Sequence, residues 1–140
     1  MKKLFYKNKD KEMKKFLFLA SAAILLAACQ ESLEERAARE ARDFTRKNCP
    51  VKLSDVITTD SLVFHENTLT LHYCLSLSGV ADTTAILKDE LRKDMVKALK
   101  GNMAIQKYKE AGYNFRYTFY STKHKGQILY DANFTPKDYK

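Results

Sequence analysis

The chain has 140 residues, with 25 lysines and arginines, 17 acidic residues and a formal net charge of +8. Much of the excess lies in residues 1–28, which hold seven lysines and two acidic residues, so the remaining 112 residues carry only +3. A chain of that length can bury one hydrophobic core and forms one small domain. So small an excess of positive charge argues against nucleic-acid binding.

The N-terminal segment has the pattern of an exported protein. An uncharged stretch of 13 residues, 16–28, follows two lysines. It is shorter than the roughly 20 residues of a transmembrane helix, whereas a basic segment before a short apolar one is typical of a secretory signal peptide. The stretch ends in the sequence LAAC, residues 26–29, which resembles the lipobox of bacterial lipoproteins. A buried core helix is the competing interpretation; we predict that residues 1–28 are a signal peptide and that Cys29 is the lipidation site.

The signal peptide has two candidate starts. Met13, followed by two lysines, is a cleaner beginning than Met1, and a long basic segment that starts at Met1 is the alternative. Targeting segments are excluded from fold prediction, so neither choice changes the expected domain.

The residues that follow Cys29 predict a helix that ends before Pro50. Four apolar residues recur at helical spacing: Leu33, Ala37, Ala41 and Phe44. The residue before a proline is disfavoured in the α region, which sets the end of the helix. The acidic residues next to Cys29 resemble the export signal by which Bacteroidetes place lipoproteins on the outer face of the outer membrane. A solvated first helical turn explains them equally well.

Alternation predicts a strand over residues 69–78. Five apolar residues face one side of it: Leu69, Leu71, Tyr73, Leu75 and Leu77. Glu66-Asn67 is a plausible hairpin turn from a preceding strand over residues 57–65.

The C-terminal half predicts helices and then a second hairpin. A helix that begins at an N-cap, Asp82 or Thr83, is interrupted at Gly101. A short helical stretch over residues 103–111 follows, and two strands flank a turn near Lys125-Gly126. The order α-β-β-α-β-β predicts the α+β class, an antiparallel four-stranded sheet with helices on one face. We divide the chain into a signal peptide (1–28), a lipidated N-terminus with the first helix (29–48) and the remainder of a single α+β domain (49–140).

Four pieces of the mature sequence carry a resemblance to other proteins. They are NCP, LTLHYCLSL, LKDELRKDMVKAL and YNFRYTFYSTKHKGQILYDANFTPKDY, which together span Asn48 to Tyr139. In these pieces the chain resembles a diffuse set of small exported bacterial proteins of unknown function. The shared motifs are structural, so the resemblance implies a fold and no catalytic residue.

The sequence offers little for catalysis or metal binding. His65, His72 and His124 stand in none of the short spacings that build metal sites. His72 and Cys74 share a strand face, so a Cys-His nucleophile is conceivable, but a disulfide or a surface pair is the simpler interpretation. We expect no enzymatic activity, with a hydrolase as the alternative, and no cofactor or metal.

Two cysteines remain once Cys29 is lipidated. Disulfides persist in the oxidising compartments outside the cytoplasm, so an even pair there predicts a bond between Cys49 and Cys74. The first helix brings the chain back to the strand end where Cys74 lies. Against the bond, Cys74 stands on the more polar side of its strand.

The two expected functions both involve a protein partner. The first is a binding or assembly lipoprotein anchored in the cell envelope, at the outer membrane, with the leaflet open. The alternative is a small inhibitor or immunity lipoprotein that neutralises an enzyme. One face of the sheet should remain uncovered, with Thr70, His72, Ser76, Arg116, Thr118 and Tyr120. Arg and Tyr are enriched at interfaces, so we predict partner binding by Arg116, Tyr120 and His72. An ordinary solvated sheet face is the alternative.

Overall fold

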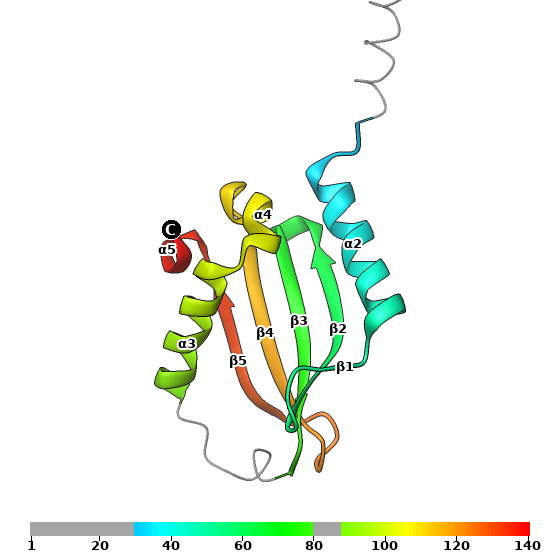
Figure 1. Ribbon diagram of the computed structural model, residues 1–140, viewed down its shortest axis with the longest axis vertical. Helices are drawn as coiled ribbons and strands as arrows, with labels where there is room; N and C mark the ends of the chain where they lie inside the picture. The colour runs from blue at the N-terminus through cyan, green and yellow to red at the C-terminus, as the bar shows by residue number, and fades with distance from the viewer. Residues whose placement is uncertain (1–29, 80–87) are drawn as a thin grey trace, which may run out of the picture. The chain divides into compact units, whose positions relative to one another are not determined.

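The computed structural model describes residues 30–79 and 88–140, and Leu33–Lys140 form one compact unit. The elements, drawn in Figure 1, are α2 (Leu33–Asn48), β1 (Val51–Lys52), β2 (Ile57–His65), η1 (Glu66–Thr68), β3 (Thr70–Leu77), α3 (Lys88–Gly101), η3 (Met103–Ile105), α4 (Gln106–Glu110), β4 (Asn114–Ser121), β5 (Ile128–Phe134) and α5 (Pro136–Tyr139). The strands form one sheet in the order β1-β2-β3-β4-β5. The expected α+β class is therefore correct.

The sheet is mixed and has five strands, so the prediction of four antiparallel strands is wrong in two respects. β3 and β4 run parallel, because α3 carries the chain back along the sheet between them and β4 starts at the same end as β3. The other pairs are antiparallel. β1 adds a two-residue edge strand, too short to produce an alternating pattern.

The predicted helices and strands that lie in the described residues are present, and they differ from the predictions mainly at their ends. β2 occupies the predicted residues, and η1 forms the turn at Glu66. β3 begins at Thr70 because Leu69 has φ 47°, a left-handed conformation in which it terminates η1. The expected N-cap at Asp82 or Thr83 lies outside the described residues. α5 was not predicted; Thr135 and Asp138 form its capping box around Pro136.

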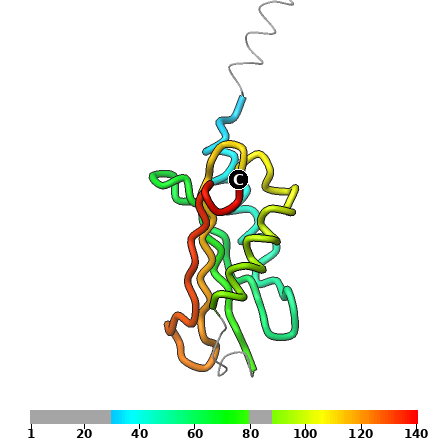
Figure 2. Tube along the Cα trace, turned by 90° about the vertical axis from the view of Figure 1, so that its left-hand side faces the viewer, coloured from blue at the N-terminus to red at the C-terminus, as the bar shows by residue number. Residues whose placement is uncertain are grey.

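The helices lie on one side of the sheet, as predicted (Figure 2). α2 packs on β2, whereas α3 contacts β5 and α5 at the other edge of the sheet. The helix face of the central strands forms much of the core, with Leu71, Leu75, Phe115 and Phe119 buried and with Tyr73 and Tyr117 half-buried against them. The side of the strands that alternation assigned to the core is thus confirmed.

Polar contacts hold α2 in place near its C-terminal end and at its middle. The Thr45 hydroxyl accepts a hydrogen bond from the Leu62 N–H and donates one to the Leu62 carbonyl, each at 2.9 Å. This satisfies outward-facing backbone groups of β2 where β1 no longer covers them. Further along α2, Glu40 accepts from Lys107 Nζ at 2.8 Å and from the Tyr108 hydroxyl at 2.6 Å, which ties α2 to α4.

The predicted disulfide is not formed, and Cys49 and Cys74 are free thiols. Cys49 lies two residues before the start of β1, which pairs with the outer side of β2, whereas Cys74 lies in β3 on the inner side of β2. Two strand spacings of about 4.8 Å each separate β1 from β3. That exceeds the roughly 7 Å between Cα atoms that a disulfide can bridge.

Candidate functional site

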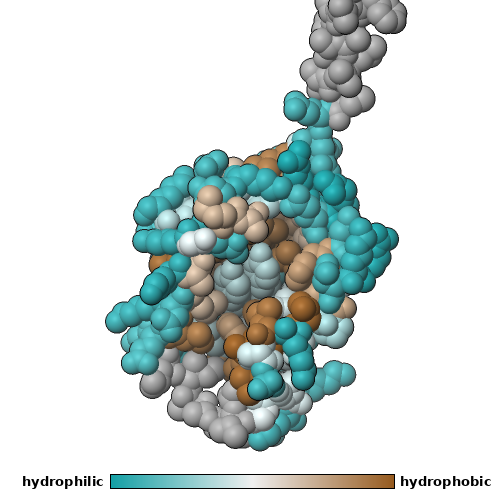
Figure 3. Space-filling model, viewed as in Figure 1, coloured by the Kyte–Doolittle hydropathy of each residue, from teal (hydrophilic) through white to brown (hydrophobic). Residues whose placement is uncertain are grey.

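The helix face of the sheet is hollowed between α2 and α3. Figure 3 shows this depression, with apolar side chains gathered around it. Because α2 packs on β2 and α3 contacts β5, the central strands β3 and β4 lie between the two helices (Figure 1). Their half-buried side chains, and those of the flanking elements, keep part of their apolar surface in water. These side chains are Leu62, Phe64, Tyr73, Leu91, Met95 and Tyr117.

Tyr73 and Tyr117 form the centre of this surface, which we call the helix-face hollow. They stand opposite each other in the parallel pair of β3 and β4, and their rings stack with centroids 4.8 Å apart and planes 6° apart. Burial raises the pKa of Tyr73 to about 12 and also raises that of Tyr117. Both phenols therefore stay neutral, so the hollow offers aromatic surface without charge.

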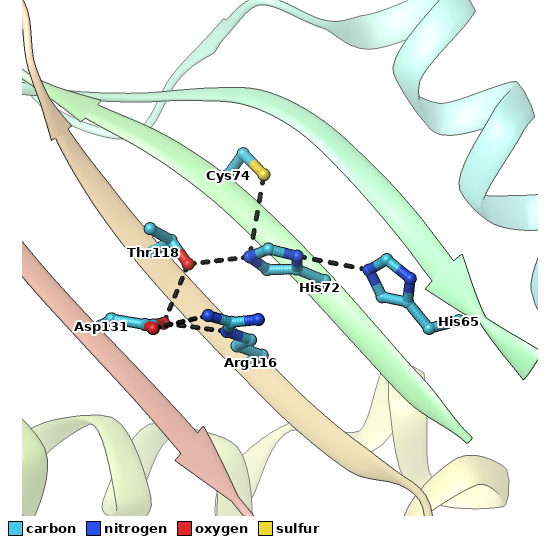
Figure 4. Close-up of polar contacts among 6 residues, drawn as sticks. All are labelled: His65, His72, Cys74, Arg116, Thr118 and Asp131. Carbon is cyan, nitrogen blue, oxygen red and sulfur yellow. Dashed lines mark hydrogen bonds and ion pairs between the residues drawn. The ribbon is translucent and has the colours of Figure 1, made fainter. Parts of the chain in front are cut away.

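The opposite face of the sheet carries a chain of polar contacts (Figure 4). His65 Nε2 lies 3.4 Å from His72 Nδ1, and His72 Nε2 lies 2.8 Å from the Thr118 hydroxyl. Thr118 donates to Asp131 Oδ1 at 2.9 Å. Arg116 clamps the same carboxylate with two bonds, Nε to Oδ1 at 3.0 Å and Nη2 to Oδ2 at 2.6 Å. We call these five residues the open-face network; they come from β2, β3, β4 and β5.

Charge within the open-face network is balanced. The Arg116 hydrogen bonds hold the pKa of Asp131 below its usual value, and Asp131 in turn raises the pKa of Arg116. Burial, followed by the positive charge of Arg116, lowers the pKa of His72. At neutral pH the network therefore contains one ion pair and a neutral His72.

The structure brings two of the three predicted partner-binding residues into one network. His72 and Arg116 join through Thr118, which is only 1% exposed although it stands on the uncovered face. Tyr120 lies on the same strand, half-buried, opposite Ser76 of β3. Their role in partner binding stays a prediction.

Sequence reasoning missed Asp131 and His65. Asp131 alternates with the buried Tyr130 and Ala132 in β5, so the alternation alone could have placed it on the open face. His65 closes β2, and its approach to His72 depends on the hairpin register.

The geometry argues against a Cys-His nucleophile. Cys74 Sγ lies 3.9 Å from His72 Nε2, but that nitrogen is hydrogen-bonded to Thr118 at the much shorter distance of 2.8 Å. Within residues 30–79 and 88–140, no group of three or more His, Cys, Asp or Glu side chains is arranged to hold a metal ion. In the same residues, no helix combines the length and apolar character needed to cross a membrane.

Three solved structures share the fold. A secreted protein from Pseudomonas aeruginosa is 15% identical with a TM-score of 0.62, over 79% of this chain and 100% of that one. EpsS, the type 2 secretion system pilotin from Vibrio vulnificus, is 15% identical with a TM-score of 0.63, over 77% and 92%. AspS, the type II secretion system pilotin from Vibrio cholerae, is 18% identical with a TM-score of 0.58, over 81% and 97%. Identities this low establish a common fold alone.

Sequence comparison assigns the chain to a family. No curated protein matches it. Residues 13–30 match the prokaryotic membrane lipoprotein lipid attachment site, which includes Cys29 and agrees with the lipobox seen in the sequence. Residues 32–130 match a second family model over most of the chain. The chain is thus a prokaryotic lipoprotein that belongs to the family described as Domain of unknown function (DUF8479).

Proposed function

We propose that this lipoprotein is a non-enzymatic binding or assembly protein of the outer membrane, and that it holds an amphipathic segment of a protein partner in the helix-face hollow. The stacked Tyr73 and Tyr117, half-buried at the centre of the sheet between two helices, are the observation that carries the proposal. Exposed apolar surface that is contiguous and rimmed by polar residues is typical of interaction sites. The fold shared with two pilotins, which are parts of a secretion system, supports an assembly role.

The hollow suits an apolar segment better than a charged ligand. Its aromatic rings are neutral, and a partner's side chains would replace water over them and gain about 25 cal/mol per Å² of apolar area. Segments recognised in this way present anchors at helical spacing along one face. The open face, with Arg116, Tyr120 and His72, is the second candidate surface. The two Arg116 bonds to Asp131 weaken that candidate, because a partner would have to compete for them.

Site-specific photo-crosslinking tests the choice of face. Tyr73 is replaced with p-benzoylphenylalanine in the native host, and Tyr120, on the open face, is replaced in the same way as the matched control. We expect an adduct with another protein from position 73 and none from position 120, with the crosslinked segment mapped by mass spectrometry as apolar on one side. The identity of the adduct also separates an assembly partner from an enzyme that an inhibitor or immunity lipoprotein would neutralise. An adduct from position 120 alone, an adduct within the chain itself, or none at either position would refute the proposal.

The lipid anchor has a separate test. Cys29 lies outside the described residues, and its acylation is inferred from the matched attachment site. The variant Cys29→Ser should accumulate as an uncut precursor that takes up no labelled palmitate. Two or more acyl chains give stable membrane attachment. The wild type should therefore fractionate with the membranes, and labelling of the variant at the wild-type level would exclude Cys29 as the anchor.

A further inference from the structure

We propose that His65 and His72 together bind a divalent transition-metal ion of the Zn²⁺ type on the open face of the sheet. His65 Nε2 and His72 Nδ1 lie 3.4 Å apart, and both rings reach the surface. Two nitrogens held at about 2.05 Å from a tetrahedral zinc ion lie roughly 3.3 Å from each other. The observed separation is close to that value and longer than the roughly 3.0 Å of an ordinary hydrogen bond.

The hairpin of β2 and β3 sets this separation. His72 stands opposite Val63, and His65 lies two residues beyond Val63 on the same face of β2. Diagonal neighbours on one face of an antiparallel pair are within reach of ring side chains. The ring centroids are 5.6 Å apart with the planes tilted by 37°, so the rings are not stacked.

The open-face network fixes which nitrogen of His72 is free to bind a metal. Asp131, ionised beside Arg116, can only accept hydrogen bonds, so Thr118 donates its single hydroxyl proton to Asp131. Thr118 must then accept from His72, which places the His72 proton on Nε2. The lone pair of Nδ1 consequently faces His65. A histidine whose second nitrogen donates into a carboxylate network is the usual arrangement of metal-binding histidines.

Space for the other ligands of a metal ion lies on the His65 side of the pair, because His72 does not line the hollow there. His65 lines an open hollow of about 920 Å³ at the end of the sheet, together with Glu66, Arg116 and Asp131. Arg116 is neutralised by Asp131, which reduces its repulsion of a cation. No third His, Cys, Asp or Glu of the described residues completes the site, so water or a ligand from another molecule occupies the remaining positions. The sequence predicted no metal because the two histidines stand seven positions apart and no local motif contains them.

Calorimetric titration with ZnCl₂ tests the site, with the full-length lipoprotein in detergent micelles. We expect one ion bound by the wild type and binding at least about tenfold weaker in His65→Ala and in His72→Ala. His124→Ala, a histidine in the exposed turn between β4 and β5, is the matched control and should bind as the wild type does. Thr118→Val keeps the shape of the side chain but removes the hydrogen bond to His72, and loss of such an outer contact weakens binding by about tenfold or more.

A second measurement needs no metal. The ¹⁵N shifts of the His72 ring in the metal-free protein should show the proton on Nε2, and Thr118→Val should abolish that preference. Variants are compared only when their far-UV circular dichroism matches that of the wild type. Zinc binding that survives both histidine substitutions unchanged would overturn the proposal, as would a wild type that binds no zinc or a His72 proton found on Nδ1.

Discussion

The two faces of this sheet are built on different principles. On the helix face, aromatic and aliphatic side chains bury one another, and where α2 and α3 leave the middle uncovered, Tyr73 and Tyr117 keep apolar surface in water. On the open face, polar side chains satisfy one another through directed contacts and need no cover. An apolar surface gains free energy from any partner that removes water, whereas a satisfied polar network gains only from a ligand that matches its geometry. The first face therefore suits a protein segment and the second an ion.

The largest expected effect comes from the core of the helix face. Phe115 is fully buried, and its ring packs edge-on against Tyr139. Phe115→Ala should lower the free energy of unfolding by about 3–5 kcal/mol, because it removes buried surface and leaves a cavity. Tyr120→Ala, on the open side of the same strand, should cost about 1 kcal/mol or less. Urea denaturation of the two variants measures these decreases in the free energy of unfolding. Equal decreases would show that the two faces contribute equally to stability at these positions.

An intermediate effect is expected at the one buried side chain of the open-face network. Thr118→Val leaves His72 Nε2 without its acceptor and Asp131 with one donor fewer, at a residue that is 1% exposed. Leaving such groups unpaired costs about 1–2 kcal/mol. Ser76→Ala on the same face removes only an exposed contact with Asp60 and serves as the control. If Thr118→Val lowers the free energy of unfolding no more than Ser76→Ala does, the open face is an ordinary solvated face.

The sequence predicts which face of each strand is buried much better than it predicts which strands pair with one another. Alternation is local, so residues 69–77 and 115–119 reveal their buried side without knowledge of the neighbouring strand. Pairing is not local. The parallel contact of β3 with β4 joins segments that α3 separates, and no pattern within either strand specifies it. The wrong prediction of a disulfide between Cys49 and Cys74 has the same cause, since the position of β1 outside β2 depends on pairing alone.

Every contact of the open-face network depends on how the strands pair. Thr118 stands directly opposite Asp131, and Arg116 reaches the same carboxylate diagonally from its position opposite Asn133. His65 meets His72 only because of the register of the first hairpin. Residue types identified Arg116, His72 and Tyr120 as candidates. Only the sheet shows that two of them share a network and that Asp131 and His65 belong to it.

A smaller effect is expected from the ion pair of the open face. Arg116 holds the pKa of Asp131 below the usual 3.8, so the unfolded chain takes up a proton first as the pH falls. The pair's contribution is complete above about pH 3.8 and is lost as the pH falls through the lower folded-state pKa of Asp131. Both side chains are partly exposed, which limits the effect of Asp131→Asn to about 1 kcal/mol at neutral pH. The free energies of unfolding of wild type and variant should converge in acid. A difference that stays constant with pH would mean that the charge of Asp131 does not contribute to stability.

The smallest effect is expected from an acidic contact on the helix side of the sheet, where Glu40 of α2 meets α4. Burial alone would raise the pKa of Glu40, but the hydrogen bonds from Lys107 and Tyr108 outweigh it and the pKa lies below the usual 4.5. The stability from this contact should start to fall near pH 4.5, earlier in an acid titration than that from Asp131, and should disappear as the pH passes the folded-state pKa of Glu40. Because the ion pair is well exposed, Glu40→Gln should cost a few tenths of a kcal/mol at neutral pH. Unfolding measured at closely spaced pH values for both variants gives the order in which the two contacts are lost. If the contribution of Asp131 to the free energy of unfolding is lost at a higher pH than that of Glu40, the expected order is wrong.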